Sequence, residues 1–575
     1  MRGYITPFKY IVLFTSILLT NGAFAQKTDF IQSLSKQNQW VDSVFDKLSK
    51  KEKIAQLFFI RAHTNKGKAY EDTVESMIKK LHVGGVVFFQ GGPGRQAALT
   101  NRYQKVSKVP LLVTLDGEWG VGMRLDSSLQ YPYQMTLGAI QDNNLIYKMG
   151  QFIAADFKRL GMHMNFAPVM DVNNNPNNPV INYRSFGDNK YNVAKKGIAY
   201  FKGMQDGGIL TTAKHFPGHG DTNVDSHYDL PLLPFTRERL DSLELYPFRE
   251  AITAGLSGMM IAHMNIPALD NSKNRPSTLS RPVITGLLKD SLKFKGLVVS
   301  DAMEMKGVTK FFPEGEADVQ AFIAGNDIIE LSENTERAIK LVRKAIRKHK
   351  VSKEEFEARV KKVLAAKYWA GLNDYKDVSP AGVAASLNRP EARQLLQQLS
   401  DAAVTLLKGN TASLRLNQTH RTAIVSVGTD QITVFQQELA RWYPNSMLFV
   451  VGKATPVREL NAMLASLKKY DQVYVGIYDT RKRPQSKLDY NLDIKFLIAQ
   501  LAAQPNTVMS VFANAYTIAG LPGIEKSGAL MVCYQNNDEL QRSAVKIITG
   551  QMKPMGKLPV SVNMFFPTGT GVMLP

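Results

Sequence analysis

The sequence predicts an α/β protein, a (β/α)₈ TIM-like barrel followed by a smaller α/β layered sandwich domain. Short runs of β-branched and aromatic residues alternate with amphipathic helical stretches from Ile54 onward, and eight such units can be counted. These units fit the roughly 250 to 350 residues that one barrel occupies. The apolar runs are continuous, which is typical of parallel strands buried on both faces. An open doubly wound sheet is the structural alternative, because a strand count from sequence varies by about one or two.

The eight expected barrel strands are spaced widely enough to leave room for helices between them. Each is followed by a Gly, Asp or Asn break, and stretches such as 236–255 and 333–349 have helical periodicity. In chain order the expected strands are 54–60, 84–89, 111–116, 163–169, 209–216, 258–264, 296–303 and 327–332.

A second α/β region is expected after an interdomain linker. Beyond Gly371 the alternation gives way to a polar stretch with two prolines, which we interpret as the linker. The second region opens with the helical stretch 389–408 and closes with 556–562. The expected segments are a leader at 1–25, the barrel at 26–375, the linker at 376–395 and the sandwich domain at 396–575. The expected strands of the sandwich domain, in a mostly parallel sheet, are 422–428, 447–452, 472–479, 507–514 and 529–535.

The first 25 residues have the three parts of a secretory signal peptide. Positive charges at Arg2 and Lys9 precede an apolar stretch at 10–19, and an Ala-Phe-Ala cleavage signal ends at Ala25. The apolar stretch is shorter than the roughly 18 to 20 residues that a membrane span needs, and we expect no span in the mature protein. The sequence therefore predicts export to the periplasm or the cell exterior, with a mature chain that starts at Gln26.

The composition excludes several classes of protein. Hydrophobic residues make up 44% and charged residues 21%, values typical of a globular chain rather than of a disordered or multi-span membrane protein. The net charge of +21 could attract nucleic acid, anionic lipid or an acidic cell-wall polymer. No basic block stands out, so we expect no nucleic-acid partner. Cys533 is the only cysteine, which excludes an intrachain disulfide, and we expect it to be a buried core thiol.

Three of the nine histidines fall in one loop, KHFPGHGDTNVDSH, at the end of the fifth expected strand. Such loops form the active site in characterised barrel enzymes. A metal site of these histidines with Asp221 and Asp225 is disfavoured, because the Pro-Gly pair prevents two histidines from sharing a helical face. A purely structural loop would explain His219 but not Asp225 and His227 together. In that Asp-Ser-His sequence the carboxylate can orient the imidazole, which can then donate and recover a proton.

Further charged residues lie at the same rim. Asp301 ends the seventh expected strand and Asp116 the third, so both carboxylates should face the mouth of the barrel. Asp301 has either a structural role, as a helix N-cap or the partner of a neighbouring lysine, or a functional one, as a nucleophile or an electrostatic stabiliser. Asp116 either caps a turn or binds sugar hydroxyls. One isolated carboxylate, an Asp/His pair and several polar donors are the groups that cleavage of a glycosidic bond requires. The candidate donors are Arg124, Arg184, Lys214 and His215.

The whole pattern resembles glycoside hydrolase family 3, and within it the bacterial β-N-acetylglucosaminidase branch. The histidine loop matches the motif most specific to this branch. The resemblance implies that Asp225 and His227 form the acid/base dyad and that Asp301 is the nucleophile. It also implies that the substrate is bound by Asp116, Arg124, Arg184, Lys214 and His215. One departure follows the third strand, where the usual D-Q-E-G-G reads DGEWG, and Trp119 is expected to reshape the sugar or aglycone site.

The resemblance implies a secreted, retaining exo-β-N-acetylglucosaminidase, without metal or cofactor, that acts on GlcNAc-containing glycans such as muropeptides. Alternatives within the family are a phosphorylase, in which phosphate replaces water, and a β-glucosidase. The alternative from another class is a non-catalytic peptidoglycan-binding module. A pure binder, however, would not need Asp301, Asp225 and His227 together.

Overall fold

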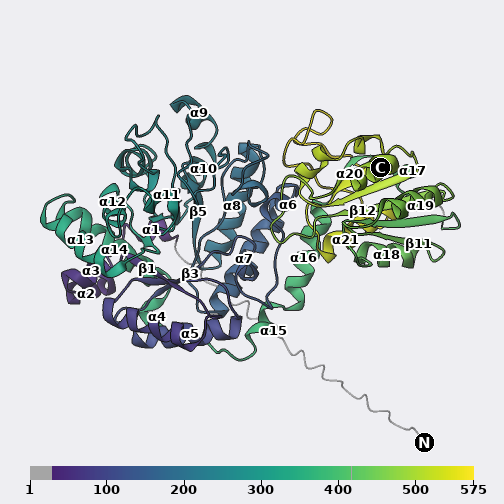
Figure 1. The fold of residues 1–575 in the computed structure, drawn as a ribbon. Coiled ribbons are helices and arrows are strands. Elements are labelled where there is room, and N and C mark those ends of the chain that lie inside the picture. Colours follow the sequence, from purple (N-terminus) through teal and green to yellow (C-terminus); the bar gives the residue numbers. More distant parts are fainter. Residues whose placement is uncertain (1–28, 416–417) are drawn as a thin grey trace, which may run out of the picture.

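The computed structural model describes residues 29–415 and 418–575, so the predicted leader at 1–25 lies outside the described residues. Two sheets organise the chain, one in a helix-covered barrel and one in a smaller C-terminal part (Figure 1). Helices α6 (Gln134–Gly138) and α16 (Pro390–Ala403) contact each other where the two parts meet. In the described part of the chain, no helix is long and apolar enough to cross a membrane.

The first sheet is a barrel of eight parallel strands. Neighbours follow the chain from β1 to β7, β8 pairs with β1, and a bridge between Val299 and Ile328 joins β7 to the segment that leads into β8. This arrangement confirms the predicted (β/α)₈ barrel and differs from an open doubly wound sheet. The strands are β1 (Phe58–Ala62), β2 (Gly85–Phe88), β3 (Leu112–Leu115), β4 (Met164–Asn165), β5 (Leu210–Phe216), β6 (Gly258–Ile261), β7 (Leu297–Ser300) and β8 (Ile329–Glu330).

Each expected barrel strand is present, but the first begins later than the sequence predicts. Residues Lys50–Ala55 form helix α3 instead of the start of β1. A capping box holds this helix, because the Ser49 hydroxyl accepts the amide of Glu52 while the Glu52 carboxylate accepts the amide of Ser49. The buried side chain of Ile54 therefore belongs to a helix and not to a strand. A short apolar run has no periodicity that separates a buried helix from a buried strand.

Helices cover the outside of the barrel, as expected for β/α alternation. The predicted stretch 333–349 is α13, whereas 236–255 is divided into α9 and α10. Pro247 lies in the first turn of α10, where proline is tolerated because the missing amide has no helical partner there. The remaining elements of this part are α1 (Phe30–Ser33), α2 (Gln39–Lys47), α3 (Lys50–Ala55), α4 (Lys68–Leu81), α5 (Pro93–Val106), η1 (Val121–Met123), α7 (Asn143–Arg159), η2 (Asn182–Arg184), α8 (Lys190–Asp206), α9 (Arg237–Ser242), α10 (Tyr246–Thr253), η3 (Ser277–Leu279), the π-helix η4 (Pro282–Ser291), α11 (Lys306–Thr309), α12 (Glu316–Ala324), α13 (Thr335–Arg347), α14 (Lys353–Trp369) and η5 (Leu372–Asp374).

The second sheet has the order β11-β10-β12-β13-β14-β9, and all its pairs are parallel except β14 with β9. The five predicted strands are present, and Cys533 is buried. The prediction of a helix through 389–408 is wrong at its end, because Thr405–Lys408 form β9. An apolar segment with a β-branched residue gains backbone hydrogen bonds at the open edge of β14. The strands are β9 (Thr405–Lys408), β10 (Thr422–Val427), β11 (Met447–Val451), β12 (Gln472–Tyr478), β13 (Thr507–Phe512) and β14 (Ala529–Val532).

The segment between the two sheets lies against the barrel. Asn101 Nδ2 donates to the carbonyl of Val378 at 2.7 Å, and Arg159 donates to the carbonyl of Ser379 at 2.5 Å. The boundaries of the linker at 376–395 stay a prediction. The helices of the C-terminal part and its approach are α15 (Val383–Leu387), α16 (Pro390–Ala403), α17 (Thr411–Leu414), α18 (Val434–Trp442), α19 (Val457–Leu467), α20 (Leu492–Ala502), η6 (Ala515–Gly520), η7 (Ile524–Lys526) and α21 (Asp538–Ile548).

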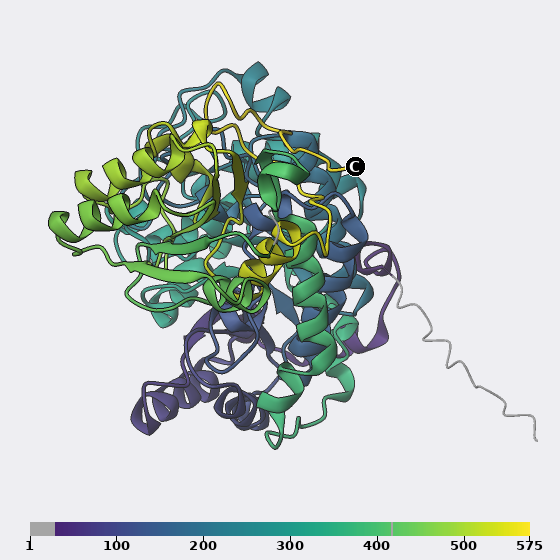
Figure 2. The same ribbon diagram turned by 90° about the vertical axis from the view of Figure 1, so that its right-hand side faces the viewer.

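The C-terminal domain lies in front of the barrel in the view of Figure 2, and polar side chains join the two. Asn514 Nδ2 donates to Asn182 Oδ1 at 2.5 Å, and the Gln535 side-chain oxygen accepts the amide of Tyr133 at 2.6 Å. Asn182 is the first residue of η2 and Arg184 the last. The C-terminal domain is therefore fixed beside a segment that carries one of the predicted site residues.

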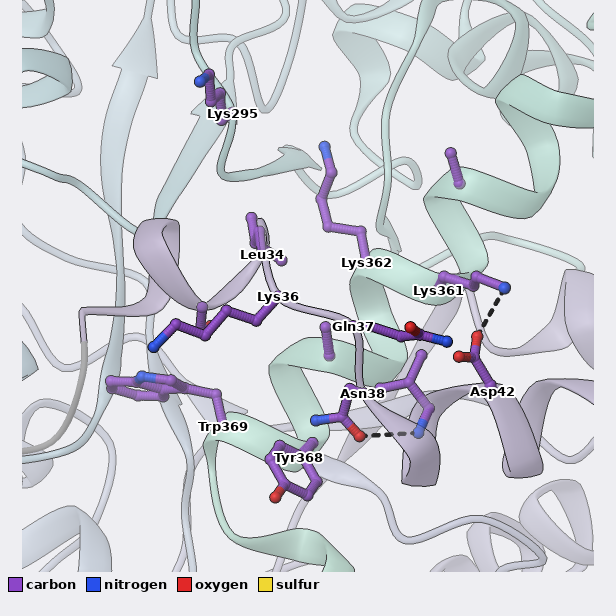
Figure 3. Close-up of a pocket in the computed structure, with 14 residues that line it drawn as sticks. Leu34, Lys36, Gln37, Asn38, Asp42, Lys295, Lys361, Lys362, Tyr368 and Trp369 are labelled. Carbon is purple, nitrogen blue, oxygen red and sulfur yellow. Dashed lines mark hydrogen bonds and ion pairs between the residues drawn. The ribbon is translucent and has the colours of Figure 1, made fainter.

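A cavity of about 660 Å³ lies at the other end of the barrel, between α2 and α14 (Figure 3). Lys295, which lines this cavity, comes just before β7, whereas Asp301 follows the same strand at its opposite end. Lys361 in the cavity wall is paired with Asp42 at 2.7 Å. The cavity is thus separated by the length of the barrel from the rim where the predicted site residues lie.

Candidate active site

The candidate site lies at the carboxyl ends of the barrel strands. Asp116 directly follows β3, Lys214 and His215 lie near the end of β5, and Asp301 directly follows β7. Because parallel strands of a barrel end at one rim, these side chains reach the same mouth although they are far apart in the sequence.

Lys214 is a buried cation held by two carboxylates. Its Nζ donates to Asp116 Oδ1 at 2.8 Å and lies 2.9 Å from Glu118 Oε1, and its side chain is 3% exposed. Arg124 donates to the other Asp116 oxygen at 2.7 Å. Burial alone would raise the pKa of Asp116, but the charges of Lys214 and Arg124 outweigh burial and lower this pKa well below its usual range. Asp116 is therefore an ionised acceptor whose geometry is fixed from two sides.

Glu118 extends this network to Arg184. The guanidinium donates through Nε to Glu118 Oε2 at 2.9 Å and through a terminal nitrogen to Oε1 at 2.6 Å, which is a bidentate pair. Burial would raise the pKa of Glu118, but the charges of Arg184 and Lys214 lower it to about 2. Glu118 was not among the predicted binding residues. Its position in DGEWG, two residues after Asp116 on the same loop, could have indicated that it lies at the site.

Asp171 holds His215 in one orientation. The Nδ1 of His215 lies 2.7 Å from Asp171 Oδ2, and the carboxylate also accepts the backbone amides of His215 and His219, the latter at 2.7 Å. A proton on Nδ1 leaves Nε2 as the acceptor, 3.4 Å from a terminal nitrogen of Arg184. Asp171 was not among the predicted site residues, because it follows β4 in a stretch without a recognisable motif.

His219 has a role inside the loop. It is fully buried, with Nδ1 2.8 Å from the Thr222 hydroxyl and Nε2 3.1 Å from the Ser226 hydroxyl. Burial lowers the pKa of His219 to about 4, so the ring is neutral near pH 7. The imidazole thus ties the two halves of the loop together.

Asp225 and His227 form the pair that their spacing suggested. Oδ1 of Asp225 lies 2.7 Å from Nδ1 of His227 and accepts its backbone amide at 2.9 Å. The hydrogen bond with Asp225 and the negative charge of Asp301 raise the pKa of His227, whose side chain is 59% exposed. The loop is fixed to α11, because the amide of Gly307 donates to the Ser226 carbonyl at 3.2 Å. His227 Nε2 is left free of Asp225 to exchange a proton with a bound molecule or with water.

Asp301 faces these imidazoles. Burial would raise its pKa, but the positive charge that His263, His215 and His227 can carry lowers it, as does the amide of Ala302, which donates to Oδ1 at 2.8 Å. The ionised form is therefore favoured. The charges of Asp301 and His227 act on each other, so the two predicted catalytic groups lie near enough to interact electrostatically.

His263 and Glu330 are two rim residues that the sequence analysis missed. His263 Nε2 lies 3.0 Å from the Ala302 carbonyl, where it holds the backbone next to Asp301. Glu330 ends β8 and is 3% exposed, and its Oε2 has no hydrogen-bond partner among the described residues. Burial and the negative charges of Asp116 and Asp301 raise the pKa of Glu330 well above its usual range, which favours the neutral form of this carboxyl. His263 and Glu330 each lie near the carboxyl end of a barrel strand, which is also the position that predicted a functional role for Asp301.

The side chains at this rim include the kinds of group that displace a leaving group at the anomeric carbon of a sugar. That reaction needs a carboxylate to attack carbon and a separate group to protonate the departing oxygen. Asp301 and His227 are the residues predicted for these two functions, and this chemistry is that of a glycoside hydrolase. Across residues 29–415 and 418–575, no group of three or more His, Cys, Asp or Glu side chains is arranged to hold a metal ion.

Comparisons with known proteins agree with this class. The model "Glycosyl hydrolase family 3 N terminal domain" matches residues 49–366, more than half of the chain. The chain therefore belongs to glycoside hydrolase family 3. It is 28% identical over 554 residues to the β-hexosaminidase A of Pseudoalteromonas piscicida, an alignment that covers 85% of this chain and 91% of that protein.

Solved structures share the fold over most of the chain. A glycoside hydrolase family 3 β-N-acetylglucosaminidase from Paenibacillus sp. str. FPU-7 is 33% identical with a TM-score of 0.75, over 90% of this chain and 99% of that one. The β-glucoside phosphorylase BglX, at 21% identity and a TM-score of 0.78, covers 92% of this chain and 97% of its own, and this likeness shows the fold alone. The predicted resemblance to the β-N-acetylglucosaminidase branch is confirmed.

Glu330→Gln should make the protein more stable at neutral and alkaline pH. A carboxyl whose folded-state pKa lies above its ordinary value contributes most to stability below that ordinary value, and the contribution is lost as the pH rises through the folded-state pKa. Glutamine keeps the shape and cannot ionise. Thermal unfolding at pH 5 and pH 8 should show a Tm gain that grows by a few degrees with pH. An equal Tm change at both values, or the same trend in exposed Glu250→Gln, would contradict a neutral Glu330.

Proposed function

We propose that the chain is an exported, retaining exo-β-N-acetylglucosaminidase that removes terminal GlcNAc from peptidoglycan fragments. The observation that carries this proposal is the Asp225–His227 pair, 2.7 Å apart, opposite the ionised Asp301. The names of the relatives support it. The Paenibacillus structure, at 33% identity, is a β-N-acetylglucosaminidase, and the Pseudoalteromonas relative is a β-hexosaminidase.

The first half-reaction forms a glycosyl-enzyme. The terminal sugar is bound through its hydroxyls by the network around Lys214, in which Asp116 is an acceptor and Arg124 a donor. Asp301 attacks the anomeric carbon and forms a C–O bond while the glycosidic C–O bond breaks. The departing oxygen takes the proton from Nε2 of His227, whose Nδ1 stays bonded to Asp225.

The second half-reaction releases the sugar. Nε2 of His227 takes a proton from water, the water oxygen attacks the anomeric carbon, and the Asp301 carboxylate leaves. Two inversions at one carbon give net retention. Exposure of the His227 side chain, at 59%, gives water access for this step.

A histidine in place of a second carboxylate also limits negative charge on the leaving-group side. An anionic aglycone, such as the lactyl and peptide carboxylates of muropeptides, is then repelled less. The net charge of the proposed mature chain, +19 once Arg2 and Lys9 are removed with the leader, acts in the same direction. The absence of a second carboxylate would also allow phosphate, an anion, to replace water as the second nucleophile. A phosphorylase is therefore the second candidate. Sugar release in phosphate buffer separates the two, since only a phosphorylase yields the sugar 1-phosphate.

Removal of the nucleophile and of the proton donor should have different consequences. Asp301→Asn should lose activity on every substrate by at least about 10³-fold, because no other group is proposed to reach the anomeric carbon. His227→Ala should lose about 10²- to 10⁴-fold on a disaccharide but far less on an aryl glycoside, whose leaving group needs no proton. Azide should partly restore aryl-glycoside turnover by His227→Ala and give a β-glycosyl azide, because azide attacks without a general base.

The exposed His420→Ala is the matched control and should keep full activity on both substrates. Equal losses on good and poor leaving groups, with no azide product, would show that His227 is a binding or structural residue. Full binding of glycan with no turnover by the unaltered protein would instead favour the non-catalytic module.

The alkaline limb of the pH–rate profile should report His227. Its proton is required in the first step, and the hydrogen bond with Asp225 raises its pKa. Asp225→Asn removes that charge, so the limb of kcat/KM should shift to lower pH, measured on a substrate with a poor leaving group. If the alkaline limb is unchanged in Asp225→Asn, it reflects the ionisation of a group other than His227.

Export predicts a processed N-terminus. Mass spectrometry of the protein from its native host should give a chain that begins at Gln26, recovered from the periplasm or the medium. Intact Met1 in a cytosolic fraction would contradict this part of the proposal.

A further inference from the structure

Three aromatic side chains lie next to the sugar-binding network. Trp119 follows Glu118 in the chain and Tyr183 precedes Arg184, so both flank the bidentate pair described above. Tyr133 completes the group, which we call the aromatic cluster (Trp119, Tyr133 and Tyr183). Its ring centroids are 4.8 Å apart for Trp119 and Tyr133 and 4.7 Å apart for Tyr133 and Tyr183.

The aromatic cluster is not part of the hydrophobic core. Each of its three rings is only half-buried, whereas the core tyrosines Tyr131 and Tyr200 are buried. The rings are tilted or edge-to-face, at interplanar angles of 73° and 53°. Because all three residues are only partly buried, part of their surface stays open. Exposed aromatic surface beside a binding site is suited to the apolar face of a ligand ring. The binding network already accounts for one sugar, so this surface is placed for the next unit of the substrate.

A loop of the C-terminal domain reaches the aromatic cluster. The hydroxyl of Tyr133 donates to the carbonyl of Lys482 at 3.5 Å, and Ser486 Oγ donates to Asn177 Oδ1 at 3.4 Å. The charge of Arg483 acts on the Tyr183 hydroxyl. Residues 481–487, which we call the basic loop, are therefore held beside the rim of the barrel by contacts at both ends.

The basic loop carries positive charge that no carboxylate neutralises. Lys482, Arg483 and Lys487 are exposed, and within residues 29–415 and 418–575 none of them lies within 4.0 Å of a carboxylate. Arg481 is different, because it is paired with Asp479 at 2.8 Å. Three unpaired cations beside open aromatic rings form a surface for a ring-shaped ligand that bears negative charge.

We propose that the aromatic cluster and the basic loop form the subsite for the aglycone, and that this aglycone is an anionic saccharide, a sugar ring carrying a carboxylate. The inference rests on the proposed function and adds to it that both domains build the substrate site. The aromatic cluster stacks on the sugar ring, and the basic loop attracts its carboxylate.

The test compares two disaccharides with one skeleton. One is GlcNAc β-1,4-linked to N-acetylmuramic acid, and the other is the same compound with its lactyl carboxylate converted to the methylamide. The unaltered protein should show a kcat/KM for the acid about five- to tenfold above that for the amide, and the ratio should fall as salt screens the charges. The triple variant Lys482→Gln, Arg483→Gln, Lys487→Gln should bring the ratio close to one.

Matched variants separate charge from stacking. Lys468→Gln, Lys469→Gln removes two exposed lysines elsewhere in the C-terminal domain and should leave the ratio unchanged. Trp119→Leu should lower kcat/KM on both disaccharides by the same factor and leave their ratio intact, because it removes ring surface and no charge.

The possible outcomes distinguish this inference from the proposed function. Equal kcat/KM on the acid and the amide, or a ratio that survives the triple variant, would overturn the anionic subsite. Failure of the unaltered protein to hydrolyse 4-nitrophenyl N-acetyl-β-glucosaminide would overturn the proposed function instead. Turnover of the aryl glycoside with loss of preference only in the triple variant supports both.

Discussion

The site depends on a buried cation, Lys214, held between two carboxylates. At 3% exposure an unpaired ammonium would be strongly disfavoured, and the structure compensates with Asp116 at 2.8 Å and Glu118 at 2.9 Å. Asp116 also binds Arg124 of its own segment after β3, and Glu118 binds Arg184 of the segment after β4. Charge therefore fixes three segments to one another, those after β3 and β4 and the end of β5, so this part of the rim is rigid. Loss of one member would leave a buried charge without its partner, which costs more than the pair contributes.

The same rim keeps its remaining carboxyl groups in different protonation states. The neutral form of Glu330 is favoured because it is buried near the charges of Asp116 and Asp301, whereas the ionised form of Asp301 is favoured because imidazoles and an amide surround it. A nucleophile must carry charge, and a second ionised carboxylate beside it would raise its pKa. The raised pKa of Glu330 limits the negative charge beside Asp301, which favours the ionised form of Asp301. The proposed proton donor, His227, is on a separate, exposed loop that is tied to the barrel through α11, so its side chain is accessible to water and to a bound molecule.

Much of the fold and part of the site follow from local sequence. Continuous apolar runs predicted all eight barrel strands, and the rule that strand ends carry the site pointed to Asp116 and Asp301. The Asp-Ser-His spacing predicted a contact that the structure shows at 2.7 Å. Other features depend on distant partners. Asp171 has no motif, because its role is to accept amides of a loop some forty residues later, and β9 is a strand only because β14 offers it an open edge. Contributions of the C-terminal domain are likewise invisible until the two domains are packed together.

The central claim is that Asp301 forms a covalent bond to the sugar while His227 moves the proton. The most direct measurement is trapping with a fluorinated, activated N-acetylglucosaminide, whose glycosyl-enzyme forms faster than it hydrolyses, followed by mass spectrometry of the intact protein and of its peptides. The account predicts a mass increase of one fluorinated sugar, located on Asp301, and no adduct in Asp301→Asn. An adduct on another residue, or turnover of the probe without any adduct, would contradict the account.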